Sequence, residues 1–413
     1  MPSPSDTPPD GMYRERRRLH CAALDLARDF VSIEQSVSFA DCKECKMIMK
    51  RLGLAATLAT AVLPASLASA ADVWGLKAGT PDLKSATTLA FGPEDILFVG
   101  DAKGATVFAV ATGNTKGDAA KASINIDDLP TAIANELHAK QVVINDLAVN
   151  PGTGAAFVAV TADESAALVQ IDGAGKISQV SLKDVKFSKA ILADAPEDKV
   201  VGEGRRAANR RTESITDIAF FENKVLVSGL SNAQSPSTVR ELNFPFAEAD
   251  KGIGVEIYHA AHGKSEDYSA MRTFVPMMID GEPSILGAYV CTPLVKIPVK
   301  ELSASGEKIK ATTVAELGNR NRPLDMIAYS KGGADYLLLS NSARGVMKIT
   351  TAGLKENKGL TEPVGGGGTA GQQFETVESM AGVIQLDKLN EISALVLVQA
   401  EGGPQNLKTI ELP

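Results

Sequence analysis

The sequence predicts an all-β protein made of six similar units of about four strands each, preceded by an export signal. Three observations lead to this expectation. Short, largely β-branched apolar runs recur between Gly, Asn, Asp and Pro, the pattern of strands joined by hairpins. The same order of runs returns six times, at intervals of about 52–71 residues. Long helical periodicity is missing, apart from one helix expected over 130–140.

Composition limits the classes of protein to which the chain can belong. Its 413 residues are 44% hydrophobic and 22% charged, with a formal net charge of -8. So many apolar residues exclude intrinsic disorder for the bulk of the chain. The net charge is also negative, whereas proteins that bind nucleic acid usually carry an excess of basic residues. We therefore expect no nucleic-acid partner.

The first 70 residues differ from the rest. We expect 1–46 to be a disordered extension outside the native protein, which leaves the start codon open among Met1, Met47 and Met49. Residues 47–70 have the order of a secretory signal peptide: a basic pair, an apolar run and small residues before a cleavage site after Ala70. The apolar run is short for a membrane span, although an uncleaved anchor helix is the alternative.

Export determines how the cysteines are interpreted. Three of the four cysteines precede the predicted cleavage site, so the mature chain from residue 71 keeps Cys291 alone and can form no internal disulfide. We expect this mature chain to be periplasmic or secreted and to have no membrane association after cleavage.

Each unit begins with a strand that starts at a small or acidic residue. The six predicted first strands are 88–91, 146–149, 217–220, 273–276, 325–328 and 379–382. A second run follows each of them and is almost purely apolar, as expected for a strand covered on both faces. A third run follows, and some units show a fourth. Six four-stranded units of this period resemble a six-bladed β-propeller over 71–413.

The last unit ends after its third strand, because the chain stops at Pro413. Residues 72–77 lie just after the predicted cleavage site and form a free strand that includes Trp74, the only tryptophan. We therefore expect this N-terminal strand to close the ring, which would remove an exposed sheet edge. A loose N-terminal linker is the alternative.

The repeats resemble the broad group of six-bladed propellers that includes the NHL-repeat and gluconolactonase-like proteins. No WD dipeptide, kelch signature or Asp-box is present. In this architecture the first strands line a central channel, so their starting residues meet at its mouth. The gluconolactonase resemblance implies a central divalent ion, but Thr88 stands where that family has a glutamate.

Asp146, Asp217 and Asp325 start three of the predicted first strands. Carboxylates gathered around one channel repel each other unless they are neutralised, and oxygen ligands of this kind suit Ca²⁺. These three residues are therefore the candidate ligands of a hard ion in the channel. Two alternatives need no metal: the aspartates cap backbone N–H groups, or Arg320 and Arg322 neutralise them.

A second candidate site combines His259, His262 and Cys291. On a helical turn, the HxxH spacing places both imidazoles on one side, and a nearby thiol completes a soft ligand set for Cu or Zn. Met271 and Met277 follow closely. A shared metal requires the two His Nε2 atoms and Cys291 Sγ to lie within about 4 Å of each other. The alternatives are a buried, inert cysteine and a Cys–His nucleophile pair.

Arginine and asparagine residues expected at the channel mouth suit a ligand that carries a carboxylate or phosphate. The candidates for binding such a ligand are Arg320, Arg322, Asn341 and Arg344. The expected partners are therefore a small acidic ligand or another exported protein.

The sequence assigns no reaction and leaves open whether the protein is an enzyme. The first interpretation is an exported propeller that serves as a binding platform through its channel-mouth face. The second is a divalent-metal-dependent hydrolase of the lactonase or esterase type. The third is a periplasmic metal-binding or redox accessory protein.

Overall fold

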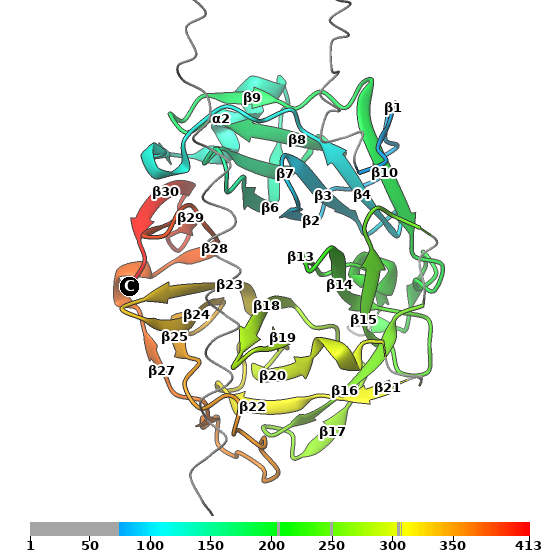
Figure 1. Cartoon of the computed structure of the whole chain (residues 1–413), viewed down its shortest axis with the longest axis vertical. Coiled ribbons are helices and arrows are strands. Elements are labelled where there is room, and N and C mark those ends of the chain that lie inside the picture. Colours follow the sequence, from blue (N-terminus) through cyan, green and yellow to red (C-terminus); the bar gives the residue numbers. More distant parts are fainter. Residues whose placement is uncertain (1–73, 205–206, 248–250, 304–305, 307) are drawn as a thin grey trace, which may run out of the picture. The chain divides into compact units, whose positions relative to one another are not determined.

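The computed structural model describes residues 74–413, except 205–206, 248–250, 304–305 and 307. These residues form six antiparallel sheets around a central channel, so the chain is a six-bladed β-propeller, as the repeats predicted (Figure 1). The extension over 1–46, the signal peptide over 47–70 and its cleavage site lie outside the described residues. Within the described part of the chain, no helix is long and apolar enough to cross a membrane.

The first two blades use segments that are interleaved along the sequence. Blade 1 consists of β2 (Thr88–Phe91), β3 (Ile96–Asp101), β4 (Thr106–Ala111), β10 (Val185–Ile191) and β1 (Lys77–Gly79), in that order from the channel outward. Blade 2 consists of β6 (Val142–Val149), β7 (Ala156–Ala162), β8 (Ser165–Ile171) and β9 (Ile177–Gln179).

Blades 3 and 4 have six and five strands. Blade 3 consists of β13 (Asp217–Phe221), β14 (Lys224–Leu230), β15 (Ser237–Asn243), β16 (Ile253–His259) and β17 (Lys264–Glu266), with β21 (Lys308–Lys310) parallel to β16. Blade 4 consists of β18 (Thr273–Ile279), β19 (Glu282–Ala288), β20 (Pro293–Pro298), β22 (Thr312–Glu316) and β26 (Ala370–Gly371).

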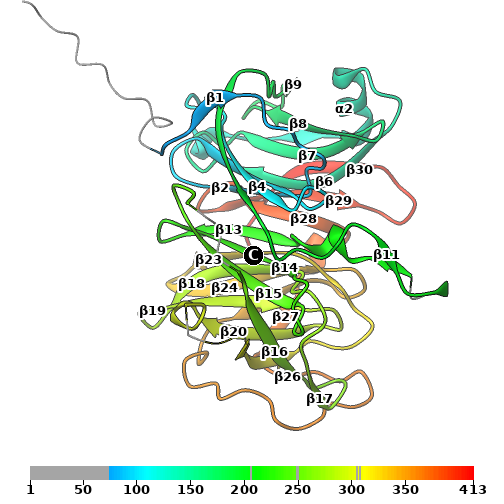
Figure 2. The same cartoon turned by 90° about the vertical axis from the view of Figure 1, so that its right-hand side faces the viewer.

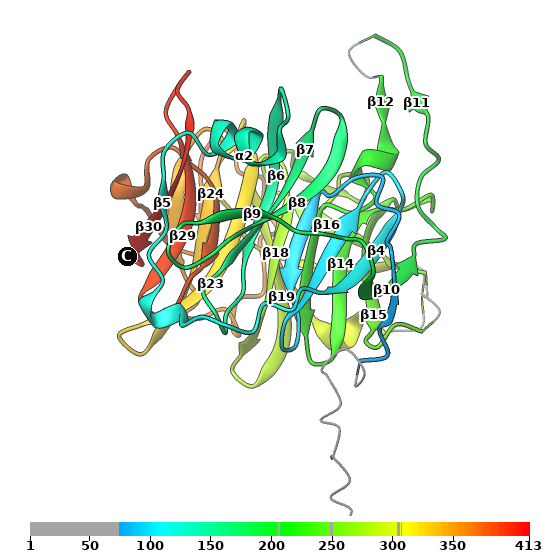
Figure 3. The same ribbon diagram turned by 90° about the horizontal axis from the view of Figure 1, so that it is seen from above.

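The last two blades have four strands each. Blade 5 consists of β23 (Pro323–Lys331), β24 (Ala334–Asn341), β25 (Gly345–Thr350) and β27 (Phe374–Thr376). Blade 6 consists of β28 (Val383–Lys388), β29 (Ser393–Gln399), β30 (Gln405–Glu411) and β5 (Asn125–Ile126). The helix expected over 130–140 is α2 (Leu129–Leu137), and a small hairpin of β11 (Val200–Val201) and β12 (Ala208–Asn209) stands away from the sheets (Figures 2 and 3).

Five of the six predicted first strands are the inner strands of their blades, but the sixth prediction is wrong. Ser379 lies in a short 3₁₀ turn, Glu378–Met380, and the inner strand of blade 6 is β28. Gly382 separates the two with a φ of 83°, a left-handed conformation that cannot continue a strand. The acidic residue that lines the channel in this blade is therefore Asp387, and Ser379 does not line it.

The predicted closure by 72–77 is also wrong. Residues Lys77–Gly79 pair with β10 on the outer edge of blade 1, and Trp74 stacks on Phe244 of blade 3. The outer strand of blade 6 is β5, which pairs with β30 and which follows blade 1 in the sequence. Ile124 exchanges two hydrogen bonds with the Thr409 hydroxyl beside this pairing. An internal segment, not the N-terminal one, supplies the missing strand.

The order of the blades around the ring differs from their order in the sequence. The inner strand of blade 1 lies beside those of blades 2 and 3, and that of blade 2 lies beside that of blade 6. Blades 3, 4, 5 and 6 then follow in sequence, so blades 1 and 2 have exchanged places (Figure 1). Buried apolar clusters follow the same neighbours: Leu129 and Ile133 of α2 pack with strands of blades 2 and 6.

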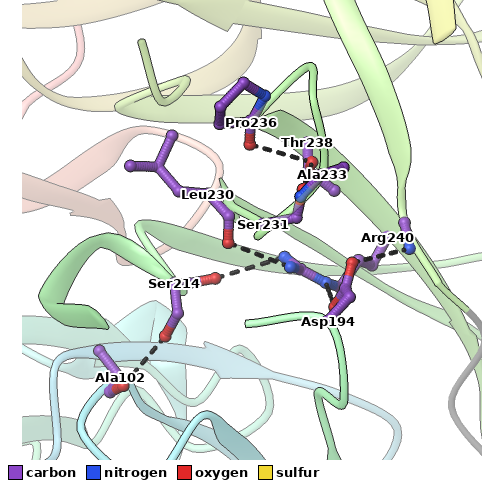
Figure 4. Close-up of polar contacts among 10 residues, drawn as sticks. Ala102, Asp194, Ser214, Leu230, Ser231, Ala233, Pro236, Thr238 and Arg240 are labelled. Atoms are coloured by element: carbon purple, nitrogen blue, oxygen red, sulfur yellow. Dashed lines mark hydrogen bonds and ion pairs between the residues drawn. The ribbon is translucent and has the colours of Figure 1, made fainter. Parts of the chain in front are cut away.

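A buried ion pair fixes the segment that returns from blade 1 to blade 3. Arg240 of β15 is only 1% exposed, and its Nε donates to Asp194 Oδ1 at 3.0 Å (Figure 4). Its two terminal nitrogens donate to the carbonyl oxygens of Ser214 and Leu230. Losing one partner of such a pair leaves an uncompensated buried charge, at a cost of about 3–5 kcal/mol. Asp194 follows β10, so this pair ties the outer strand of blade 1 to blade 3.

Candidate functional site

Four aspartates from four inner strands form a ring at the waist of the channel: Asp146, Asp217, Asp325 and Asp387. We call them the acid ring. Each accepts a backbone N–H from the inner strand of a neighbouring blade, at 2.7–2.9 Å, from Leu89, Phe274, Leu386 and Val149 respectively. The acid ring thus joins four of the six seams between blades, in the capping arrangement that was one alternative to a metal.

Burial raises the pKa of all four carboxyl groups. It raises the pKa of Asp217 and Asp387 from the ordinary value of 3.8 to about 6. For Asp325, burial and the charges of Asp217 and Asp387 raise the pKa to about 8. Burial and the proximity of Asp325 also raise the pKa of Asp146. At neutral pH, Asp325 therefore keeps its proton, which reduces the repulsion within the ring.

One end of the channel widens into a cavity of about 400 Å³ above the acid ring. Thr88, Asp146, Asp217 and Asp325 line it, as the propeller architecture predicts for residues at the starts of inner strands. Arg272 and Arg322 also line it. We call this end the channel mouth. The opposite end is a second cavity, of about 440 Å³, which shares three of the four aspartates.

The four predicted ligand-binding residues do not come together. Arg322 lines the channel mouth, whereas Arg320 does not line that cavity. Asn341 is buried and accepts a hydrogen bond from Asn321. The Arg344 guanidinium lies 3.4 Å from the carbonyl oxygens of Asn319 and Gly367, where it holds two loops together. Of the four, the geometry gives only Arg322 a position in the cavity.

The two histidines lie at one end of the β16–β17 hairpin, on the outer part of blade 3. His259 is the last residue of β16, and the His262 N–H donates to the His259 carbonyl oxygen across a tight turn. This is a hairpin turn rather than the helical turn predicted, but it also brings the two imidazoles together, with ring centroids 3.8 Å apart. His259 is buried and His262 is 42% exposed.

Glu266 fixes the orientation of both imidazoles. Its Oε2 lies 2.8 Å from His259 Nδ1, and its Oε1 lies 2.8 Å from His262 Nδ1. A carboxylate accepts hydrogen bonds, so both Nδ1 atoms carry protons and both Nε2 atoms carry lone pairs. His259 Nε2 is buried and has no hydrogen-bond partner among the described residues. One strand pairing, Ile257 with Glu266, sets this arrangement.

Cys291 reaches the histidines from blade 4. It lies in the turn between β19 and β20, with a φ of 64°, and its N–H donates to the Asn321 carbonyl oxygen at 2.8 Å. One ligand atom each from His259, His262 and Cys291 lie within 4.8 Å of one another. These three residues and Glu266 form what we call the seam cluster, because they bridge blades 3 and 4. This spread is wider than the distance of about 4 Å that a shared ion requires, so the three residues would have to move closer together to bind one ion.

Burial favours a neutral imidazole at His259. Burial lowers the pKa of His259, although the hydrogen bond to Glu266 opposes this shift. For Glu266, burial acts to raise the pKa, but the hydrogen bonds with His259 and His262 outweigh it and lower the pKa to about 2. A neutral imidazole held by a carboxylate is the form in which histidine binds metals.

A second glutamate anchors the histidine hairpin on blade 4. Glu316 of β22 is fully buried and accepts the N–H of Ala261, between the two histidines, at 3.0 Å. Burial raises its pKa to about 7. The sulfur atoms suggested by the sequence lie elsewhere: Met271 packs in the core beneath Gly287, and Met277 pairs with Ser284 at the far end of β18 and β19.

Sequence reasoning missed three residues that shape these sites. Asp387 was missed because the sixth repeat was aligned on Ser379, four residues before β28. Glu266 has a usable signal: it lies seven residues after His259, where a hairpin returns the chain to its side. Arg272 directly precedes β18, so its position at the start of an inner strand places it at the channel mouth.

No family model matches the sequence, and no curated protein matches it. The PQQ-bound aldose sugar dehydrogenase of Streptomyces coelicolor has 11% identity and a TM-score of 0.30, over 81% of this chain and 96% of that chain. A putative glucose dehydrogenase of Thermus thermophilus has 10% identity and a TM-score of 0.32, over 81% and 100%. The extracellular domain of a putative one-component system of B. thetaiotaomicron has 8% identity and a TM-score of 0.36, over 81% and 39%.

Proposed function

We propose that this protein is an exported propeller that binds one transition-metal ion through His259, His262 and Cys291. The observation that carries this proposal is the pair of imidazoles whose Nδ1 atoms are both held by Glu266. Their lone pairs remain on Nε2, and the buried Nε2 of His259 has no partner within the described residues. An unpaired buried acceptor costs about 1–3 kcal/mol, and a bound ion would remove that cost.

The donor set selects the class of ion. Two imidazole nitrogens and one thiolate suit Zn²⁺, Cu⁺ or Cu²⁺ rather than Ca²⁺ or Mg²⁺, which prefer oxygen. Three protein ligands leave a coordination position for an external ligand. His262 is partly exposed, so an ion has a path to the cluster from solvent. These features favour a metal-binding or redox accessory role outside the cytoplasm.

The hydrolase interpretation would place a hard ion at Asp146, Asp217 and Asp325. In each of these residues, an oxygen already accepts a backbone N–H from the neighbouring blade. An ion there would compete with bonds that join the blades. The geometry therefore favours the seam cluster, where one ligand atom from each of the three residues lies within 4.8 Å of the others and Glu266 holds the Nδ1 atoms.

Competitive titration of the reduced protein with Zn²⁺ and with Cu⁺ tests the proposal. We expect one ion per chain, and we expect Cys291→Ser or His262→Gln to weaken binding by about 100-fold or more. That loss should exceed the effect of Glu266→Gln, because removing an outer partner of a ligand typically costs about 10–100-fold.

His138→Gln is the matched control, because His138 is the remaining histidine of the described residues and lies exposed at the end of α2. It should bind either ion like the parent. Equal affinities of the parent and the His262→Gln variant for both ions would refute the proposal.

A further inference from the structure

Two arginines share the channel mouth. Arg272 directly precedes β18 and is largely buried, and its Nη1 donates to Glu213 Oε1 at 2.7 Å. Arg322 directly precedes β23 and is exposed at the rim. Burial and the charge of Arg322 both lower the pKa of Arg272, so the two guanidinium groups are close enough to repel each other. The fold therefore holds two like charges together at one end of the channel.

Glu213 neutralises only one of these charges. Within the described residues, the Arg322 guanidinium forms no hydrogen bond or ion pair; only its backbone N–H is bonded, to the Ser342 hydroxyl. An oxyanion between the two guanidinium groups would relieve their repulsion. It would also supply the planar pair of acceptors that arginine binds best.

The floor of the cavity does not repel an anion as its aspartates would suggest. Asp325 has a pKa of about 8, because burial and neighbouring carboxylates disfavour its charge, so it is neutral at pH 7. Burial also raises the pKa of Asp146, and it raises that of Asp217 to about 6. The proton on Asp325 lowers the negative charge of the floor, and Arg322 adds a positive charge to the lining of the same cavity.

The walls offer further polar groups. Thr88 Oγ1 and Gln385 Oε1 are buried in the lining of the channel mouth and have no hydrogen-bond partner among the described residues. The Gln385 amide is oriented, because its Nε2 donates to the Asn145 carbonyl oxygen at 2.7 Å. The volume of about 400 Å³ falls within the range of about 300–1,000 Å³ typical of small-molecule sites.

We infer that the channel mouth binds a small polar molecule that carries one oxyanion group, a carboxylate or a phosphate, between Arg272 and Arg322. The Gln385 amide, which is held by the Asn145 carbonyl oxygen, supplies a polar group in the lining for the uncharged part of the ligand. This site is separate from the seam cluster and does not depend on a metal there.

Isothermal titration calorimetry of the protein in EDTA, with a matched series of three probes, tests the inference. D-Gluconate, D-glucose 6-phosphate and D-glucose have the same carbon skeleton with a carboxylate, a phosphate or no charge. We expect at least one anion to bind and glucose not to bind. The anion that binds more tightly then shows whether the site prefers a carboxylate or a phosphate. Added salt should weaken binding, because Arg322 is exposed and its charge is screened.

Arg322→Gln should weaken binding of the preferred anion by about tenfold or more, since a hydrogen bond to a charged group contributes about 1.5–3 kcal/mol. Arg320→Gln is the matched control: it removes the same charge two residues away, from a side chain that does not line the cavity. It should change the affinity by less than about twofold.

Three results would overturn the inference: no anion binding below about 10 mM, glucose binding as tightly as the anions, or equal losses in the Arg320→Gln and Arg322→Gln variants. Arg322 is exposed, so its substitution should leave the melting temperature unchanged. That measurement shows whether a loss of binding is specific to the site.

Discussion

The acid ring and the seam cluster each gather side chains with metal-binding atoms from distant parts of the chain. In the acid ring, carboxylate oxygens accept N–H groups from neighbouring blades, so the carboxylates help to hold the propeller together. In the seam cluster, one glutamate contacts Nδ1 of both imidazoles, and the buried Nε2 of His259 has no hydrogen-bond partner among the described residues. Side chains with metal-binding atoms therefore stabilise the fold in the acid ring, whereas in the seam cluster they remain available to bind an ion. The distinguishing property is whether the lone pairs already have partners.

The largest expected difference between the two regions is in folding stability. Asp387→Ala removes the acceptors of the Val149 and Lys388 N–H groups, so the free energy of unfolding should fall by about 2–5 kcal/mol. Cys291→Ser, measured without metal, should change it by about 0.5 kcal/mol or less. Urea unfolding measures both. Glu362→Ala, an exposed acid, is the control, and a loss as small as in that control would remove the structural role of Asp387.

Metal binding should change the free energy of unfolding by a smaller amount. Zn²⁺ at about 100 times its dissociation constant should stabilise the parent by about 2.7 kcal/mol. The same increment should appear in Asp387→Ala, because the two regions share no partner, and it should be absent in His262→Gln. Thermal unfolding with and without Zn²⁺ measures it. Loss of the increment in Asp387→Ala would show that the two regions are coupled.

The smallest expected effect is a change in how the free energy of unfolding depends on pH. Asp217, Asp325 and Asp387 have higher pKa values in the folded than in the unfolded protein, so the folded state binds more protons. The stability from these groups is full below about pH 3.8 and is lost as pH rises through about 6, and through about 8 for Asp325. Asp325→Asn should therefore flatten the fall in unfolding free energy between pH 6 and 8.

The control for this measurement is Asp163→Asn. Backbone hydrogen bonds from Lys140 and Gln141 lower the pKa of Asp163, so its contribution to stability is lost only as pH falls through that lowered value. Its variant should keep the parental profile above pH 5. An unchanged slope in Asp325→Asn would mean that the acid ring does not titrate in this range.

The sequence was sufficient for the strands but not for their partners. Alternating apolar runs predicted five inner strands and the helix, because periodicity is a local property. The local sequence does not specify which strand pairs with Asn125–Ile126. The pairing of this segment with β30 and the exchanged order of blades 1 and 2 were therefore not predicted. The last repeat was aligned wrongly because Ser379-Met-Ala-Gly382 has the composition of a strand, whereas Gly382 makes a turn.

The candidate sites show the same division. The spacing of His259 and His262 suggested a shared ion, and Cys291 was added to the predicted site as a nearby thiol. The role of Glu266 depends on the register of a hairpin, which spacing alone does not give. Arg322 was predicted at the channel mouth and lines it, whereas Arg320, two residues before it and also predicted there, does not line the cavity.

The exchanged blade order has a consequence for how the chain reaches its native state. The bonds between Ile124 and Thr409 join residues 285 apart, so blade 6 cannot acquire its outer strand until almost the whole chain is present. Contacts this distant in sequence carry a high loop-closure cost and slow folding. Until then, the free edge of β30 and the unpaired residues Asn125–Ile126 are open to pairing with other chains. The late step in folding is therefore the one most exposed to aggregation, and it joins the last strand, β30, to an internal segment that precedes blade 2.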